Sequence, residues 1–160
     1  MTDFTTALAR ADQPGATYDA LARLVDETVG ARLFTTMEID TVRGVARRSH
    51  SNMPEAYPVS GEKPLQFGHW HEVVEGRREI FVANSIEEIA EVFPDHELIR
   101  SLGCESCINV PVVVGGTVMG TLNCLHEAGH YTPERVAAAE ALKLPGAAAF
   151  LLSATMKKEA

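Results

Sequence analysis

The sequence lacks long apolar runs and any visible export signal. Its longest apolar stretches, such as residues 110–114, fall far short of the roughly 20 residues that a membrane-spanning helix needs. The first residues, Met-Thr-Asp-Phe, contain no positively charged segment that leads into an apolar run, so we expect no secretory signal. We therefore expect a cytoplasmic protein that has no membrane partner.

The sequence is also poor in basic residues. It has 14 Lys and Arg against 22 Asp and Glu, a formal charge of -8, and this field repels phosphate backbones and anionic membrane surfaces. The densest basic groups, Arg47-Arg48 and Arg77-Arg78, are too short to form a binding stripe and are interpreted as solvated surface charge. The composition therefore predicts no nucleic-acid partner.

Cysteine is scarce, and its number is odd. Three cysteines in a chain with no export signal indicate reduced thiols rather than a disulfide framework. Cys104 and Cys107 form a Cys-x-x-Cys string, but it leads into a predicted strand, where residues three apart point to opposite faces. The two sulfurs would not readily pair, so we interpret both as buried small hydrophobes, with disulfide redox chemistry as the alternative.

The histidines lack the spacing of a metal site. His69 and His71 flank the single tryptophan, Trp70, but no further ligand follows at the usual metal-binding interval, so we predict no metal. We interpret His69 and His71 as hydrogen-bonding groups at the surface, with ligand contact as the alternative. His126 and His130 are interpreted as part of the turn before the last helix, with His126 near enough to reach a neighbouring pocket.

Hydrophobic periodicity predicts an α+β order of elements. A composition of 46% hydrophobic residues in 160 is enough for one packed core. The expected elements are a helix over 16–29, strands over 31–39 and 45–50, a proline-containing loop over 51–64, a helix over 67–75, a strand over 80–83, helical turns over 86–92 and 95–102, and a hairpin over 107–126. A closing helix begins with Thr132 as its N-cap, runs to Met156 and kinks or divides at Pro145, near Leu144. This order predicts an antiparallel sheet of about five strands with the terminal helices on one face.

The predicted hairpin, with Gly115-Gly116 as its turn, has one apolar and one polar face. Strand alternation places Ile108, Val110, Val112 and Val114 on one side of the first strand, and Val118, Gly120, Leu122 and Cys124 on one side of the second. These apolar sides are expected to meet the terminal helices. The other side carries Cys107, Asn109, Pro111, Val113, Met119, Thr121, Asn123 and Leu125, and it faces the loop-rich middle of the chain.

Three segments resemble the GAF domain family. The run from Ile108 to Asn123 is similar to the last hairpin of that family, in which a Val-Pro-Val-like strand turns through glycine into an "x-x-x-Gly-x-Leu" strand. The segment Phe81-Val82-Ala83-Asn84-Ser85 resembles the family's short strand beside the pocket lid. Tyr131-Thr132-Pro133-Glu134 is similar to the family's "Phe-Thr-x-Glu-Asp" step into the closing helix. The resemblance covers about residues 16–155, so residues 1–160 are expected to form a single GAF domain.

The resemblance implies a pocket between the sheet and about residues 52–102, under a lid of loops and short helices. The expected ligand-binding residues are those that the polar hairpin face and the Trp70 segment bring there: Trp70, His69, Cys107, Asn109, Thr121 and Asn123. Family members bind varied small molecules, and many only sense them. We therefore predict a small-molecule sensor or regulatory module with no resident cofactor, which passes its signal to an effector protein.

The alternative is a small enzyme of the same fold, which would use a pocket thiol or imidazole on a small metabolite. The candidates are Cys104, Cys107 and His69. The free methionine-(R)-sulfoxide reductase is a stand-alone protein of this family, but it has a cysteine on the lid well before the hairpin, and here no cysteine precedes Cys104. The Cys-His pair of bilin-binding members and the Asn-Lys-Phe-Asp-Glu pattern of cyclic-nucleotide-binding members are also absent from the sequence.

The closing helix is expected to support a homodimer. Leu142, Leu144, Phe150 and Leu151 give this helix more apolar surface than one sheet face plausibly covers. Apolar surface of that kind favours a helix bundle between two copies of the chain.

Overall fold

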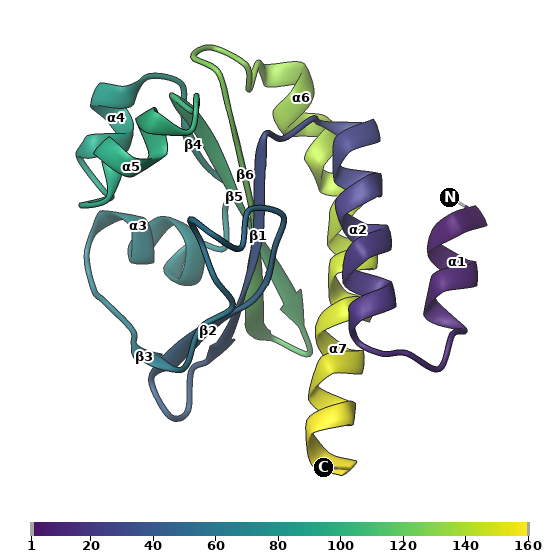
Figure 1. Cartoon of the computed structure of the whole chain (residues 1–160). Coiled ribbons are helices and arrows are strands. Elements are labelled where there is room, and N and C mark those ends of the chain that lie inside the picture. Colours follow the sequence, from purple (N-terminus) through teal and green to yellow (C-terminus); the bar gives the residue numbers. More distant parts are fainter. Residues whose placement is uncertain (1, 160) are drawn as a thin grey trace.

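A central antiparallel sheet separates two layers of helices (Figure 1). The structure is a computed structural model and describes residues 2–159. The sheet has six strands in the order β3-β2-β1-β6-β5-β4. The strands are β1 Leu33–Asp40, β2 Val45–Ser51, β3 Lys63–Pro64, β4 Phe81–Ala83, β5 Ser106–Val114 and β6 Thr117–His126. The predicted α+β architecture with an antiparallel sheet is confirmed, with one strand more than expected.

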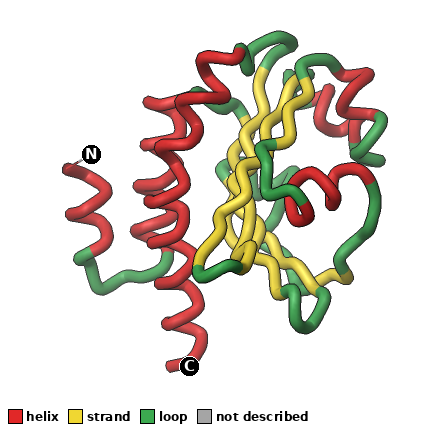
Figure 2. Tube along the Cα trace, turned by 180° about the vertical axis from the view of Figure 1, so that it is seen from behind, coloured by secondary structure: helices red, strands yellow, loops and turns green. Residues whose placement is uncertain are grey.

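The helices divide between the two faces of the sheet. One face is covered by α2 Gly15–Thr28, α6 Pro133–Ala138, the 3₁₀ turn η2 Ala139–Leu142 and α7 Lys143–Glu159, with α1 Thr2–Leu8 outside α2 (Figures 1 and 2). The opposite face carries α3 His69–His71, the π-helical turn η1 Glu72–Gly76, α4 Ile86–Ala90 and α5 His96–Ser101. Long helices on one face and short helices with loops on the other match the predicted layers.

Two short elements fall outside the predicted order. The sixth strand, β3, lies within the segment predicted as a loop, because Pro64 argued against a strand. Pro64 pairs with Val45 at the edge of the sheet, where a residue without an N–H is tolerated. The helix α1 was not predicted, and its Phe4 and Ala7 are buried in the same core cluster as residues of α2.

The closing helix begins and divides close to the predicted positions. The Thr132 hydroxyl accepts the N–H of Arg135 at 3.4 Å, and Pro133 occupies the first helical position. The division is the 3₁₀ turn Ala139–Leu142, just before the expected Leu144, and α7 starts again at Lys143. Pro145 therefore lies in the first turn of α7, where its missing N–H breaks no helical hydrogen bond.

The closing helix is more apolar over its length than the short apolar runs of the sequence suggested. Residues Pro133–Lys158 are long and apolar enough to cross a membrane by length and composition, since they contain an 18-residue window with a mean hydropathy of 1.4. The same segment is a core element of the domain, since Leu142 and Phe150 on it are buried against the sheet and α2. Those two side chains are therefore not available for the predicted dimer interface, unlike Leu144 and Leu151, which are exposed.

The central hairpin forms as predicted except at one bulge. Gly115 and Gly116 have φ angles of 57° and 79°, the positive values that a two-residue turn of this kind requires. The register shifts between Val112 and Val113, so that both Met119 and Gly120 lie opposite Val112. Met119 consequently packs against the core cluster on the helix side, not on the cavity side where simple alternation placed it.

Gly120 allows the sheet and the closing helix to approach each other closely. A Cβ atom at this position would lie 2.2 Å from the Met37 carbonyl oxygen and 2.7 Å from Cζ of Phe150. Real Cβ atoms do not approach backbone so closely, so β1, β6 and α7 could not keep their positions around a larger residue.

We predict that Gly120→Ala destabilises the protein by about 1–3 kcal/mol or more, because overpacking against backbone leaves no flexible group to move aside. Urea denaturation measures the change in the free energy of unfolding. Gly61→Ala is the matched control, since a Cβ there meets nothing within 4 Å. Equal stability of the two variants would contradict the close packing of Gly120.

Candidate functional site

A cavity of about 590 Å³ lies between the sheet and the layer of short helices. Its floor is formed by β1, β5 and β6, and its walls are formed by the chain from β2 to α5. All six residues expected to bind a ligand lie in its lining: His69, Trp70, Cys107, Asn109, Thr121 and Asn123. The structure thus brings together residues that are up to 54 positions apart (69 to 123) in the sequence.

A chain of side-chain hydrogen bonds runs along the floor of the cavity. Trp70 Nε1 donates to Asn109 Oδ1 at 2.8 Å, and Asn109 Nδ2 donates to Asn123 Oδ1 at 2.8 Å. Asn123 Nδ2 then donates to the Thr35 hydroxyl at 3.2 Å. The register of β5 and β6 creates this chain, because it places Asn109 directly opposite Asn123. The amides therefore bond first to each other and hold the Trp70 ring in place.

Aromatic side chains form the mouth of the cavity. Trp70 is half-buried, His69 is exposed, and Phe67 is 82% exposed. The Phe67 ring contacts His71 with ring centroids 4.6 Å apart, and the His69 ring lies 6.3 Å from that of Phe81. An amphipathic wall of this kind suits the planar or apolar part of a small ligand.

The π-helical turn η1 brings an unpredicted acid into the cavity wall. The Glu75 side chain is 6% exposed, and it forms a close ion pair with Nδ1 of His71. That contact has the distance of an ion pair but not the geometry of a hydrogen bond, and no described residue donates a hydrogen bond to either carboxylate oxygen. The only sequence signal for this site was the spacing of four between His71 and Glu75.

A second unpredicted cluster surrounds Arg48 on β2. Its guanidinium carbon lies 4.9 Å from the centre of the Tyr57 ring, and the Tyr57 hydroxyl donates to Asp95. Burial lowers the pKa of Arg48, and burial followed by the Asp95 contact raises the pKa of Tyr57. The interpretation of Arg47-Arg48 as solvated charge is wrong, because Arg48 lines the cavity and Arg47 pairs with Glu38 at 2.7 Å.

The three thiols are buried and free. Cys107 lies in the cavity lining but is 1% exposed, and burial raises its pKa to about 12. Burial also raises the pKa of Cys104 and of Cys124, and neither of these lines the cavity. Cys104 precedes β5 and shares a core cluster with Cys107, so the two do not occupy opposite faces as predicted. Neutral buried thiols are poor nucleophiles.

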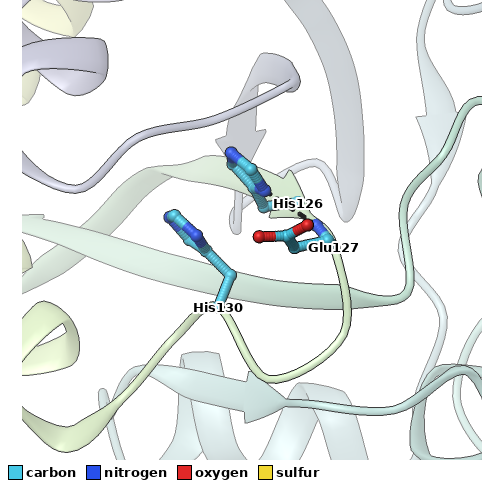
Figure 3. A group of neighbouring side chains, drawn as sticks. All are labelled: His126, Glu127 and His130. Atoms are coloured by element: carbon cyan, nitrogen blue, oxygen red, sulfur yellow. Dashed lines mark hydrogen bonds between the residues drawn. The ribbon is translucent and has the colours of Figure 1, made fainter.

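Two histidines and an acid gather outside the cavity, at the end of β6 (Figure 3). The rings of His126 and His130 stack at 3.7 Å with 4° between their planes, and burial, followed by the neighbouring His130, lowers the pKa of His126. Nδ1 of His126 accepts the N–H of Glu127, and Nε2 of His130 contacts the Val29 carbonyl. In-plane lone pairs of parallel rings do not converge on one ion. We therefore interpret these three residues as part of the turn between β6 and α6. His126 does not line the cavity, so its position agrees with the interpretation as part of the turn and not with the alternative of a pocket contact.

We predict that the folded protein reacts with a thiol reagent at pH 8 far more slowly than the denatured chain, because burial holds all three thiols neutral. Ellman titration should find three reactive groups after denaturation and almost none within minutes beforehand. One rapidly reacting thiol in the folded protein, traced to Cys104 or Cys107 by mass spectrometry, would contradict this and support thiol chemistry.

Comparison with solved structures identifies the fold. A domain of a two-component sensor histidine kinase protein from Sinorhizobium meliloti 1021 superimposes with a TM-score of 0.68 at 15% identity, over 93% of this chain and 99% of that one. The GAF domain of a phosphoenolpyruvate-protein phosphotransferase from Coxiella burnetii gives a TM-score of 0.65 at 18% identity, over 99% and 96%. A red/green cyanobacteriochrome gives 0.59 at 15% identity, over 86% and 94%.

These likenesses, at such low identity, establish the fold alone. No curated protein sequence is significantly similar to this chain. The family profile described as "GAF domain" matches residues 12–149, which contain the whole sheet, the cavity, α2, α6 and the start of α7. With that match over most of its length and the same fold as solved GAF domains, this chain belongs to the GAF domain family.

Proposed function

We propose that this chain is a regulatory domain that binds a small molecule in the cavity between β1, β5, β6 and the short helices. The observation that carries the proposal is the cavity itself, about 590 Å³ with an apolar and aromatic wall and a few inward polar groups. Binding sites for small molecules commonly have about 300–1,000 Å³ and this kind of lining. GAF neighbours in sensor kinases and cyanobacteriochromes belong to sensory proteins, which supports the same role here.

The thiols support binding rather than thiol catalysis. Of the three residues named for the enzymatic alternative, Cys104 is outside the cavity lining and Cys107 is buried with a raised pKa. His69 is exposed at the mouth, and no described residue forms a hydrogen bond with its ring that would orient it as a general base. A sensor, unlike an enzyme, needs no reactive thiol or imidazole, because ligand binding between the short helices and the sheet is sufficient for its role.

We predict that native mass spectrometry of freshly purified protein shows a small molecule that denaturing conditions release. Asn123→Leu should weaken its retention by about 1–3 kcal/mol in binding free energy, because Asn109 and Thr35 then lose their partner in the cavity floor. Fluorescence of Trp70, the only tryptophan, reports binding directly.

Thr36→Val is the control for that substitution. Thr36 is buried on the helix-facing side of β1, where its hydroxyl contacts Ser49 at 2.7 Å. Its loss removes a buried hydrogen bond without touching the cavity, so ligand retention should stay at the wild-type level. Equal retention by Asn123→Leu and Thr36→Val would count against the cavity as the binding site.

We also propose that two copies pair through α7 and pass the signal to an effector protein. Leu144 and Leu151 are 80% and 45% exposed, and a spacing of seven places them on one face of the helix. Near its C-terminal end, α7 extends beyond the β5–β6 turn (Figure 1).

We predict a dimer by light scattering at tens of micromolar and a monomer for the double variant Leu144→Glu, Leu151→Glu, because two charges on the apolar stripe would have to be desolvated at the interface. Val42→Glu is the control, since Val42 is 94% exposed in the β1–β2 turn. A monomeric wild-type mass would contradict the proposal.

A further inference from the structure

Several buried polar atoms in the cavity lining form no hydrogen bond with a described residue, and they belong to Arg48, His71, Glu75 and Thr121. No described residue forms a hydrogen bond with either carboxylate oxygen of Glu75 or with the hydroxyl of Thr121. The Glu75 side chain is 6% exposed, Thr121 is 1% exposed, and both lie in the cavity lining. A buried carboxylate without donors is costly, so its position calls for a partner of complementary chemistry.

The amides on the cavity floor cannot be the main recognition groups. Asn109 and Asn123 already bond to Trp70, to each other and to Thr35. A ligand that used these amides would compete with existing bonds, whereas one that used Glu75 would add new ones. Polar recognition therefore falls to the atoms that the protein leaves without hydrogen bonds.

The backbone around Glu75 has an unusual helical conformation. Residues Glu72–Gly76 form a π-helical turn, closed by the Arg77 N–H to the Glu72 carbonyl at 2.8 Å. Such turns insert one extra residue into a helix and occur frequently at functional sites. Here the turn buries Val73 and Val74 in the core while Glu75 lines the cavity.

The His71 contact does not replace a ligand. It lies within ion-pair distance of the carboxylate but lacks hydrogen-bond geometry, so both carboxylate oxygens remain without a hydrogen bond from a described residue. A carboxylate accepts hydrogen bonds only, and it binds a planar amidinium or an ammonium through strong charge-assisted bonds. The nearby rings of Trp70 and Phe93 in the lining provide the wall for an attached apolar group.

We propose that the cavity recognises a cationic nitrogen, an ammonium or amidinium, on a small aromatic or apolar molecule, and that Glu75 is its partner. This inference rests on the proposed function and names the ligand class for the same cavity. Thr121 provides a second hydrogen-bonding group in the floor, and the aromatic mouth encloses the apolar part of the ligand.

The test compares charged probes with neutral probes of the same shape. Benzamidine and phenethylamine at millimolar concentration should raise the melting temperature and change Trp70 fluorescence. Benzamide and 2-phenylethanol should bind at least about tenfold more weakly, because they offer Glu75 no charged donor. No response to either cationic probe, or equal responses to charged and neutral probes, would overturn the inference.

Variants of two acids on the same turn separate recognition from structure. Glu75→Gln should abolish the preference for the cationic probes without lowering the melting temperature of the free protein. Glu72→Gln removes the same charge from an exposed position and should leave the preference unchanged. A lower melting temperature for Glu75→Gln with the preference intact would show that Glu75 serves only to hold His71.

Failure of this inference differs from failure of the proposed function. A native complex with a neutral or anionic molecule would overturn the cationic ligand class but keep the binding role. Protein that carries no ligand and responds to no small molecule of any charge would overturn both.

Discussion

The register of the β5–β6 hairpin is the constraint on which the site depends. The turn at Gly115-Gly116 fixes the pairing, and the pairing sets Asn109 opposite Asn123. A slip by one residue would move every side chain of the hairpin to the other face of the sheet. The amide pair would then enter the apolar core beneath α7, and Ile108 and Leu122 would enter the cavity. The glycine turn therefore determines which side chains of the hairpin enter the core and which line the cavity.

The two faces of this sheet differ in how closely they are packed. The helix-facing cluster holds the large buried side chains, including Phe34, Leu122 and Phe150, packed against α2 and α7. The opposite face leaves a cavity, in which the side chains of Glu75 and Thr121 form no hydrogen bond with any described residue. Each such group lowers stability, and the packed face offsets that cost.

Local chemistry explains which parts of the site could be predicted from the sequence. The glycine turn and strand alternation were sufficient to place Asn109, Thr121 and Asn123 on the cavity face, and the same alternation applied to β1 would have added Thr35. Met119 was misplaced because a bulge depends on the fit between neighbouring strands and not on either strand alone.

Glu75 and Arg48 could not be predicted for a different reason. Whether Glu75 faces the cavity depends on one extra residue in a helical turn, and no residue pattern in the sequence marks that insertion. Arg48 resembled surface charge because its surroundings form only in the fold: the Tyr57 ring lies against its guanidinium, and Asp95, 47 positions further along the chain, accepts the hydrogen bond of Tyr57. Hydrophobic periodicity does not predict which polar side chains become buried by packing between separate parts of the chain.

The same strand that forms the floor of the cavity also limits how the domain can respond to a ligand. Thr121 lies in the cavity lining, and its neighbour Gly120 packs against Phe150 of α7 with no room for even a methyl group. A tightly packed contact transmits displacement instead of absorbing it, because interiors have low compressibility. Movement of β6 toward or away from a ligand must therefore shift Phe150 and the helix that carries it. The exposed face of α7, with Leu144 and Leu151, lies on that helix. The cavity and the helix with the exposed face are thus joined by two adjacent residues of one strand, Gly120 and Thr121.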